Sequence, residues 1–386
     1  MSLRIVVSAG EVSGDRHLSR VVSALRAIRP DCVIRGMAGE ESERAGVDLV
    51  VDCYRSGATM GFGQVVRSAG KVLSSLRSMT ALIRDWRPDL VILVDYPDFN
   101  MRLAKYARES GAKVFYYIPP KVWAWRSSRV KKIKRYVDHV AAIFPFEKRF
   151  FADRGYENVT YVGHPLGDRI EDTARERSNA LLILPGSRTF EVEKILPPAL
   201  RVFERLRRTR PDLSATIVVA PNMSIDKLRS RASELVGVQA FQSIRWFQGD
   251  PLTAMREARA GILKSGTCNL EGAVAGLPFV SVYSGSYLSK VIASALVPLK
   301  EFSPVNILRS GTVKEVFAVT IDEDLLEAEV VKVLEEGAER SRIVDGLLSV
   351  RKALQVPDSR ASNQDVIGVP QRVAHLALSL VPNKVV

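Results

Sequence analysis

Leu3-Arg4-Ile5-Val6-Val7-Ser8-Ala9-Gly10-Glu11-Val12-Ser13-Gly14-Asp15 is the stretch that decides the fold, because an apolar run leads through a glycine-containing turn into a helical stretch. Glycines in such a turn let backbone amides approach a ligand at a helix N-terminus, where anions are favoured. The same succession recurs at Ala180-Leu181-Leu182-Ile183-Leu184-Pro185-Gly186-Ser187-Arg188, now with a guanidinium that can hold two phosphate oxygens. Either turn could equally be a helix start with no ligand near it.

Further short β-branched runs extend this pattern in both directions. They lie near 3–8, 32–36, 89–94, 113–118 and 138–143, and then near 180–184, 214–219, 260–263 and 279–283, with helical stretches between them. Such alternation predicts an α/β protein with parallel sheets covered by helices on both faces. Because there are two series, we expect two Rossmann-like domains, 1–168 and 169–356, with a hinge near 168–179. A terminal helical stretch, about 357–386, could pack back onto the first domain.

The composition indicates an anionic partner. The chain has 386 residues, 46% of them hydrophobic, and a formal net charge of +13. Nucleic acid, a nucleotide sugar and an acidic membrane surface would all suit that charge. The sequence has no zinc-finger spacing, no RNP-like aromatic string and no basic helix followed by heptads, so we expect no nucleic-acid partner.

The compartment follows from the cysteines and from the apolar runs. Cys32, Cys53 and Cys268 are odd in number and widely spaced, which predicts neither a disulfide framework nor a zinc site and fits a reduced cytoplasm. The four histidines are scattered, and we expect no metal. The sequence shows no signal-peptide pattern and no run of 18 uncharged apolar residues, so we expect a protein that is neither exported nor membrane-spanning.

Two more turns carry candidate chemistry. Lys264-Ser265-Gly266-Thr267 follows an apolar strand and offers another helix N-terminus to phosphate, with Glu271 placed to accept hydrogen bonds from ribose hydroxyls. Asp98 lies on a turn after the strand Leu90-Val91-Ile92-Leu93-Val94, where it could deprotonate an attacking hydroxyl or could merely cap the next helix. His164, in Gly163-His164-Pro165, could touch substrate or only form a turn.

Two segments suit a partner that is both apolar and anionic. Tyr116-Tyr117-Ile118-Pro119-Pro120-Lys121-Val122-Trp123-Ala124-Trp125-Arg126 holds two of the four tryptophans and opens a stretch without an acidic residue before Asp138. Residues 62–87 place apolar side chains three and four residues apart, interleaved with Arg and Lys. That pattern predicts a basic amphipathic helix, which either packs against its own sheet or lies in a lipid interface.

A set of motifs, taken in order over roughly residues 3–310, resembles the lipid-A-disaccharide synthase family. The set comprises 8–15, Met60-Gly61-Phe62, 95–100, 122–126, Phe144-Pro145-Phe146-Glu147, Gly163-His164-Pro165-Leu166, 184–188 and Ser265-Gly266-Thr267 with Leu270-Glu271. The resemblance implies a glycosyltransferase B fold whose two domains face an interdomain cleft. It further implies inverting transfer, without metal or cofactor, from a UDP-2,3-diacylglucosamine donor to a 2,3-diacylglucosamine 1-phosphate acceptor. A cytoplasmic enzyme, peripheral to the inner membrane and homodimeric, is implied as well.

Residue roles follow from the same resemblance. It implies Asp98 as general base, Arg188 for the UDP diphosphate, Ser265, Gly266, Thr267 and Glu271 for ribose and phosphate, and Asn306 near the donor. The other substrate-binding candidates are Gly10, Ser13, Gly14, Asp15, Asn100, Trp123, Trp125, Arg126, His164, Gly186 and Ser187.

Two alternatives stay open at this point. Another UDP-sugar transferase or an epimerase on the same scaffold would share the phosphate turns without needing the tryptophan segment. A diverged, non-catalytic paralogue that binds UDP-sugar or lipid is the second, prompted by Gly311, Thr312 and Ala318, which differ from the family pattern.

Overall fold

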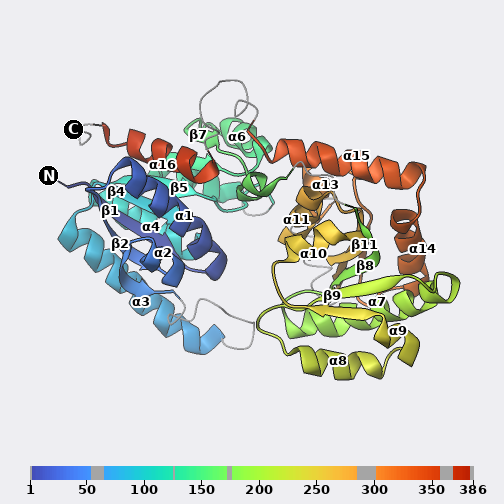
Figure 1. The fold of residues 1–386 in the computed structure, drawn as a ribbon. Helices are drawn as coiled ribbons and strands as arrows, with labels where there is room; N and C mark the ends of the chain where they lie inside the picture. The colour runs from blue at the N-terminus through green and yellow to red at the C-terminus, as the bar shows by residue number, and fades with distance from the viewer. Residues whose placement is uncertain are drawn as a thin grey trace. The chain divides into compact units, whose positions relative to one another are not determined.

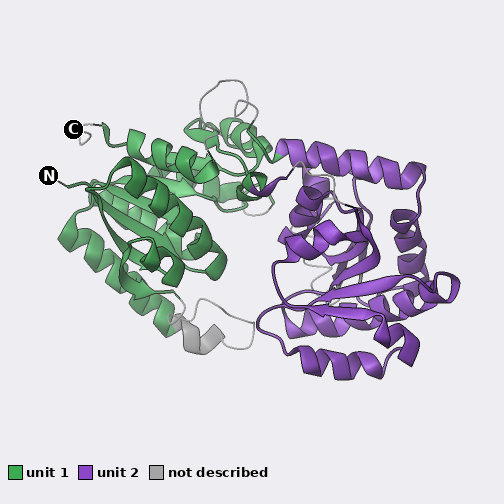
Figure 2. Cartoon of the chain, in the orientation of Figure 1, with its two compact units in different colours: residues 1–168, 354–386 green, residues 169–353 purple. Residues whose placement is uncertain are grey.

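The computed structural model describes residues 2–53, 65–124, 127–171, 176–284, 301–356 and 368–382. The chain divides into two compact units (Figure 2). Unit 1 consists of Met1–Asp168 and Leu354–Val386, and unit 2 of Arg169–Ala353. The C-terminal segment therefore belongs with the N-terminal unit.

Unit 1 is built on a parallel sheet of seven strands (Figure 1). The strands are β1 (Arg4–Ala9), β2 (Val33–Ala38), β3 (Asp48–Asp52), β4 (Leu90–Val94), β5 (Lys113–Tyr117), β6 (His139–Ala142) and β7 (Val159–Tyr161). They lie in the order β3-β2-β1-β4-β5-β6-β7, so β1 and β4 are the neighbours from which the chain winds outward in both directions.

Helices pack around this sheet in groups. They are α1 (Val12–Ile28), α2 (Glu40–Arg44), α3 (Val65–Trp86), α4 (Pro97–Glu109), α5 (Val130–Tyr136), α6 (Pro145–Ala152) and α16 (Val369–Ser379), with short 3-10 helices η2 (Ser127–Arg129) and η3 (Pro165–Arg169). One group is formed by α3, α4 and α5, and another by α1 with α2 and α16. The contact of α16 with α1 and β6 returns the end of the chain to unit 1.

The basic amphipathic helix predicted over 62–87 is α3, and its C-terminal half packs against its own sheet. Leu76, Met79, Leu82 and Ile83 are buried in the apolar core of unit 1. Leu73, one turn earlier, is 46% exposed. Packing therefore accounts for most of the apolar stripe that the structure describes.

Unit 2 repeats the architecture with a six-stranded parallel sheet. Its strands are β8 (Ser178–Leu184), β9 (Ser214–Val218), β10 (Ile244–Phe247), β11 (Ala258–Lys264), β12 (Phe279–Ser284) and β13 (Glu315–Ala318), in the order β10-β9-β8-β11-β12-β13. Its helices are α7 (Thr189–Thr209), α8 (Ile225–Ser233), α9 (Val238–Gln242), α10 (Pro251–Glu257), α11 (Thr267–Ala275), α13 (Pro304–Leu308), α14 (Glu323–Leu334) and α15 (Ala338–Ala353). Here β8 and β11 are the central pair.

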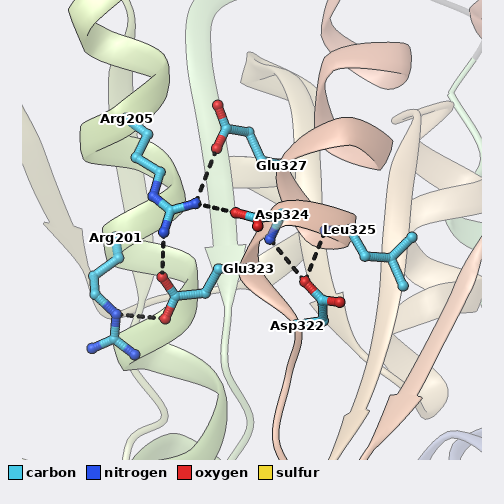
Figure 3. A network of polar contacts seen from close by, with 7 residues as sticks. All are labelled: Arg201, Arg205, Asp322, Glu323, Asp324, Leu325 and Glu327. Atoms are coloured by element: carbon cyan, nitrogen blue, oxygen red, sulfur yellow. Dashed lines mark hydrogen bonds and ion pairs between the residues drawn. The ribbon is translucent and has the colours of Figure 1, made fainter.

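A cluster of charges joins α7 to α14 in unit 2 (Figure 3). The Arg205 guanidinium lies 2.6 Å from Asp324 Oδ1, 3.1 Å from Glu323 Oε2 and 3.4 Å from Glu327 Oε2. Arg201 Nε adds a 2.6 Å contact to Glu323 Oε1. Because several partners share each charge, this network holds the two helices side by side more firmly than an isolated surface ion pair would.

The sequence pattern locates the inner strands of both sheets and omits β3, β7, β10 and β13. These four are the edge strands. Parallel strands that are covered on both faces are continuous apolar runs, such as the fully buried β4, whereas β3 is Asp-Leu-Val-Val-Asp with no buried residue. An edge strand is short and partly solvated, so it lacks the signal on which the prediction depends.

Candidate functional site

Each sheet has one topological switch point, where the strand order reverses. In unit 1 it lies between β1 and β4, and in unit 2 between β8 and β11. Ligands of open parallel sheets bind outside the carboxyl ends of the strands at such points. The turns that follow these four strands carry Gly10, Asp98, Gly186 and Ser265, so four of the predicted motifs lie at two equivalent places.

Asp98 lies in the first turn of α4, directly beyond the carboxyl end of β4. Its side chain is 74% exposed and forms an ion pair with Arg129 of η2. The structure does not use Asp98 as the helix cap, because the N-cap position is Tyr96 and no side-chain capping bond is formed. The carboxylate therefore faces solvent at the switch point, with a guanidinium beside it.

The turn that presents Asp98 has an unusual backbone, which two buried groups hold. Asp95 and Tyr96 have φ values of +48° and +47°, in the left-handed region. The buried Asn100 amide donates from Nδ2 to the carbonyl oxygen of Asp95 (2.7 Å) and accepts from Ser8 Oγ (2.7 Å). Tyr116 Oη donates to the same Asp95 carbonyl (2.8 Å). Asn100 thus fastens the turn to the end of β1, and its predicted contact with substrate stays a prediction.

Gly10, on the neighbouring turn, lies beneath an aromatic ring. A Cβ at this position would come within 2.1 Å of the Tyr96 ring. The backbone at Gly10 is therefore covered by Tyr96, and a ligand could contact it only if that ring moved. Ser13 is exposed on α1, whereas Gly14 packs against Ala9.

Asp15 serves α2 rather than the open edge of the sheet. Its buried carboxylate accepts hydrogen bonds from the backbone N–H groups of Gly39 (2.9 Å), Glu41 (3.1 Å) and Ser42 (3.2 Å). These bonds satisfy the first amides of α2. Asp15 thus caps α2, and its predicted role toward substrate stays a prediction.

Trp123 is held by a buried carboxylate in a group of aromatic rings. Its Nε1–H donates to Glu147 Oε1 (3.0 Å), and its ring meets Phe144 and Phe146 edge-on at centroid distances of 6.0 and 5.0 Å. Glu147 Oε2 accepts from the backbone N–H of Phe144 (3.0 Å). Burial raises the pKa of Glu147 to about 7, against the opposing effect of these hydrogen bonds. Trp125 and Arg126 lie outside the described residues.

His164 belongs to the same aromatic group. Its ring lies 5.4 Å from that of Phe144, and its Nδ1 accepts the backbone N–H of Leu166 at 3.1 Å. Burial lowers the pKa of His164 to about 3, with smaller contributions from His17 and Lys121. The His164 ring is therefore neutral, and the hydrogen bond that its Nδ1 accepts from Leu166 closes the Gly163-His164-Pro165 turn.

In unit 2, the turn after β8 closes around Glu191. Gly186 has a φ of +122°, and a Cβ there would lie 2.5 Å from Glu191 Oε2. That same oxygen accepts the backbone N–H groups of Ser187 (3.2 Å) and Arg188 (3.4 Å). The Arg188 side chain is 65% exposed, with its Nη1 3.8 Å from Glu191 Oε1. The turn thus presents a solvent-facing guanidinium at the N-terminus of α7.

The turn after β11 lies directly beside the first one. Gly266 is the N-cap of α11 with a φ of +155°, Thr267 is exposed, and Ser265 is buried, with its backbone N–H bonded to the Val282 carbonyl (2.7 Å). Lys264, the last residue of β11, places its Nζ 3.0 Å from Glu191 Oε1. One buried carboxylate therefore joins both turns.

Glu271 and Asn306 have different surroundings. Burial raises the pKa of Glu271, with a smaller contribution from Asp250 and opposition from Arg169. Asn306 is buried, and its Nδ2 donates to the Val313 carbonyl (2.9 Å) and to Glu315 Oε1 (2.7 Å). Asn306 thus fixes the segment between α13 and β13, and donor contact by either residue stays a prediction.

Four residues that contact or adjoin the predicted site residues were not themselves predicted. They are Arg129, Glu147, Glu191 and Lys264. Glu191 had a usable signal, because a Glu three residues after a helix start is the pattern of a capping box. Arg129 had none, since it lies 31 positions away from Asp98 and is brought there by the packing of α4 against α5, the helix that follows η2.

The described residues contain neither a metal-binding cluster nor a membrane-spanning helix. No group of three or more His, Cys, Asp or Glu side chains among them could hold a metal ion. Within the same ranges, no helix is both long and apolar enough to span a membrane.

Nearly the whole chain is similar in sequence to one family of known proteins. A family model described as LpxB, lipid-A-disaccharide synthetase, matches residues 5–366. The chain is 34% identical over 391 residues to the lipid-A-disaccharide synthase of Myxococcus xanthus (strain DK1622), covering 98% of each. It is 32% identical over 388 residues to that of Anaeromyxobacter dehalogenans (strain 2CP-1 / ATCC BAA-258), covering 98% of this chain and 97% of the relative.

Solved structures match the fold at low identity. The S. aureus MnaA–UDP co-structure has a TM-score of 0.63 at 12% identity, covering 98% of this chain and 97% of that one. CalG4, the calicheamicin glycosyltransferase, has a TM-score of 0.61 at 13% identity over the whole of both chains. The two parallel-sheet units thus have the architecture of the glycosyltransferase B fold.

Proposed function

The chain belongs to the lipid-A-disaccharide synthetase family, and we propose that it joins UDP-2,3-diacylglucosamine to 2,3-diacylglucosamine 1-phosphate with inversion, releasing UDP. The observation that carries the proposal is the family match over residues 5–366, because this range includes the switch points of both units. In this proposal, unit 1 receives the acceptor and unit 2 the UDP-sugar.

Asp98 is the proposed general base. Inverting transfer needs one group that takes the proton from the attacking hydroxyl and one site that stabilises the departing UDP. The exposed carboxylate at the switch point of unit 1 supports the first role. Its ion pair with Arg129 is compatible with that role, because an ionised carboxylate has about four lone-pair sites.

The donor diphosphate is assigned to the paired turns of unit 2. Arg188 is exposed there, and the helices α7 and α11 both begin there. Helix N-termini favour anions, and a guanidinium can hold two phosphate oxygens at once. Glu271, in the first turns of α11, is proposed to accept hydrogen bonds from the ribose hydroxyls.

Peripheral binding to the cytoplasmic face of the inner membrane is the proposed location. Its support is a set of exposed basic side chains on α4 and α5, two helices that pack against each other. These side chains are Arg102, Lys105, Arg108, Lys131, Lys132, Lys134 and Arg135. Helix α5 has no acidic residue. Each such cation near an anionic bilayer contributes about 1 kcal/mol of attraction.

Binding to vesicles tests this location. Vesicles of phosphatidylcholine with phosphatidylserine should bind the protein, and Lys131→Ala with Lys132→Ala should weaken that binding by roughly tenfold at 0.1 M salt. The control is Lys227→Ala with Arg229→Ala on α8 of unit 2, which should leave binding unchanged. Binding that is insensitive to salt would count against an electrostatic contact. The homodimer that the family resemblance implies is tested separately, by sedimentation of the full chain.

The reaction itself is tested with both substrates. Purified protein is incubated with UDP-diacylglucosamine and diacylglucosamine 1-phosphate, and the disaccharide and UDP are measured by mass spectrometry. Product from acylated substrates alone supports the proposal. UDP binding without product would favour the non-catalytic paralogue, whereas transfer between unacylated sugars, or epimerised UDP-sugar, would favour the other enzymes of this fold.

A further inference from the structure

Lys264 lies between the two turns at the switch point of unit 2. The register of β8 and β11 pairs Leu263 with Leu184, so Lys264 comes next to the Pro185-Gly186 turn. Its Nζ is 3.6 Å from the point that a Cβ on Gly266 would occupy. The ammonium group therefore stands beside both turns, at the edge of the sheet to which the donor diphosphate is assigned.

Glu191 fixes the position of this ammonium group. The Glu191 side chain is only 6% exposed, and its Oε2 is held by two backbone N–H groups of the α7 turn. Its Oε1 is thereby directed at Lys264 Nζ, 3.0 Å away. A lysine normally loses much rotamer freedom when it binds a ligand, and a side chain that is already held in place loses less.

The ammonium group retains capacity for a second anion. It carries three N–H donors, and a single carboxylate oxygen accounts for its one ion pair within the part of the chain that the structure describes. The Lys264 side chain is 24% exposed, in contrast to the nearly enclosed Glu191. The carboxylate of Glu191 is thus the buried member of the pair, and the ammonium group of Lys264 is the more exposed member, beside the turns.

We propose that Lys264 is a second diphosphate-binding cation beside Arg188, held ready by Glu191. The inference rests on the proposed binding of UDP-sugar to unit 2 and adds a residue to it. Arg188 reaches the diphosphate from the α7 turn, and Lys264 reaches it from the end of β11. A compact ammonium group acts there as a point charge, as lysines do in other phosphate sites.

The alternative is that Lys264 only neutralises the buried Glu191, and a charge-balanced pair of substitutions separates the two. Lys264→Met alone would leave the buried Glu191 with only the exposed Arg188 guanidinium, 3.8 Å away, as a counter-ion, so it tests stability as much as binding. Lys264→Met with Glu191→Gln removes both charges and keeps the net charge and the side-chain sizes. The matched control is Lys332→Met with Glu329→Gln, which removes the 2.8 Å pair on α14 of the same unit.

Calorimetric titration with UDP, and NMR titration with uridine, give the readout. The Lys264/Glu191 double variant should bind UDP roughly ten- to a hundredfold more weakly, which is the loss of one charge-assisted contact, and should bind uridine as the wild type does. The α14 control should match the wild type for both ligands. Wild-type affinity of the Lys264/Glu191 double variant for UDP would overturn the proposal.

Chemical labelling keeps the proposal testable if that variant does not fold. Reductive methylation of the wild-type protein, followed by mass spectrometry, should show Lys264 protected by UDP but not by uridine, with Lys332 labelled equally throughout. Labelling of Lys264 that UDP does not change would overturn the proposal. A wild-type protein that binds no UDP at all would instead refute the proposed function on which the inference rests.

Discussion

The switch points of the two units occupy the same place in the same topology, yet their chemistry is opposite. In unit 1, the Tyr96 ring covers Gly10, Glu11 is the N-cap of α1, and Asp98 faces solvent. In unit 2, Arg188 and Lys264 stand beside two helix N-termini. An acidic edge suits the deprotonation of a hydroxyl, and a basic edge suits a diphosphate. The fold determines where a ligand can bind, and the side chains on the turns determine which one.

The strongest effect is expected from removal of the carboxylate at the switch point of unit 1. Asp98→Asn should lower kcat by roughly 10²–10⁴-fold, the usual contribution of a general base, while the Kd for UDP stays within about twofold. Steady-state kinetics and calorimetry measure the two quantities. Asp85→Asn, which removes another exposed, arginine-paired carboxylate of unit 1, is the control and should change neither. Equal loss of UDP affinity in Asp98→Asn would contradict the division of labour between the units.

A second prediction concerns the ring that covers the turn of unit 1. Gly10→Ala should lower the free energy of unfolding by about 1–3 kcal/mol, because its Cβ would overlap the Tyr96 ring. Urea denaturation measures this. Gly14→Ala is the matched control, since its nearest neighbour is an ordinary contact 3.5 Å away and alanine favours the helix. If the two variants were equally stable, Tyr96 would not pack over Gly10 in solution.

A third prediction is that His164 makes the stability of unit 1 depend on pH. Its folded pKa of about 3 lies below the unfolded value near 6.5, so its contribution to stability is present above pH 6.5 and is lost as the pH falls toward 3. Between pH 6.5 and 5 this loss is about 1.6 kcal/mol. His164→Asn should reduce the acid destabilisation by that amount in urea titrations at the two pH values, and His375→Asn, on the exposed face of α16, should not. Acid destabilisation that is equal in His164→Asn and in the wild type would contradict the prediction.

Burial of Glu147 acts in the opposite direction and sets the size of the net effect. Its folded pKa of about 7 exceeds the unfolded value near 4.5, so the folded state gains protons at this residue between those values and is favoured by acidification there. The effect of Glu147 on the pH dependence of stability thus opposes that of His164. Burial also lowers the pKa of His17, to about 4, which adds to the acid destabilisation, whereas burial raises the pKa of Asp95 and of Asp168, which opposes it.

The sequence predicts those parts of the molecule that leave a local pattern. The inner strands and the glycine turns have such patterns, and so does the α3 stripe. The edge strands do not, since β7 is only Val159–Tyr161. The side-chain partners of the site depend on tertiary packing: Lys264 at the end of β11 meets Glu191 at the start of α7, and Arg129 of η2 meets Asp98 of α4. No spacing along the chain encodes these pairs.

The backbone before Asp98 has a consequence for the stability of unit 1. Left-handed geometry at a residue with a Cβ costs on the order of 1–2 kcal/mol, and Asp95 and Tyr96 adopt it in succession. The hydrogen bonds of Asn100 and Tyr116 to the Asp95 carbonyl offset that strain. These bonds hold the turn in its strained conformation, and glycine in place of Asp95 would relieve the strain there. Such a relaxed protein would be harder to unfold and would aim the carboxylate of Asp98 less steadily.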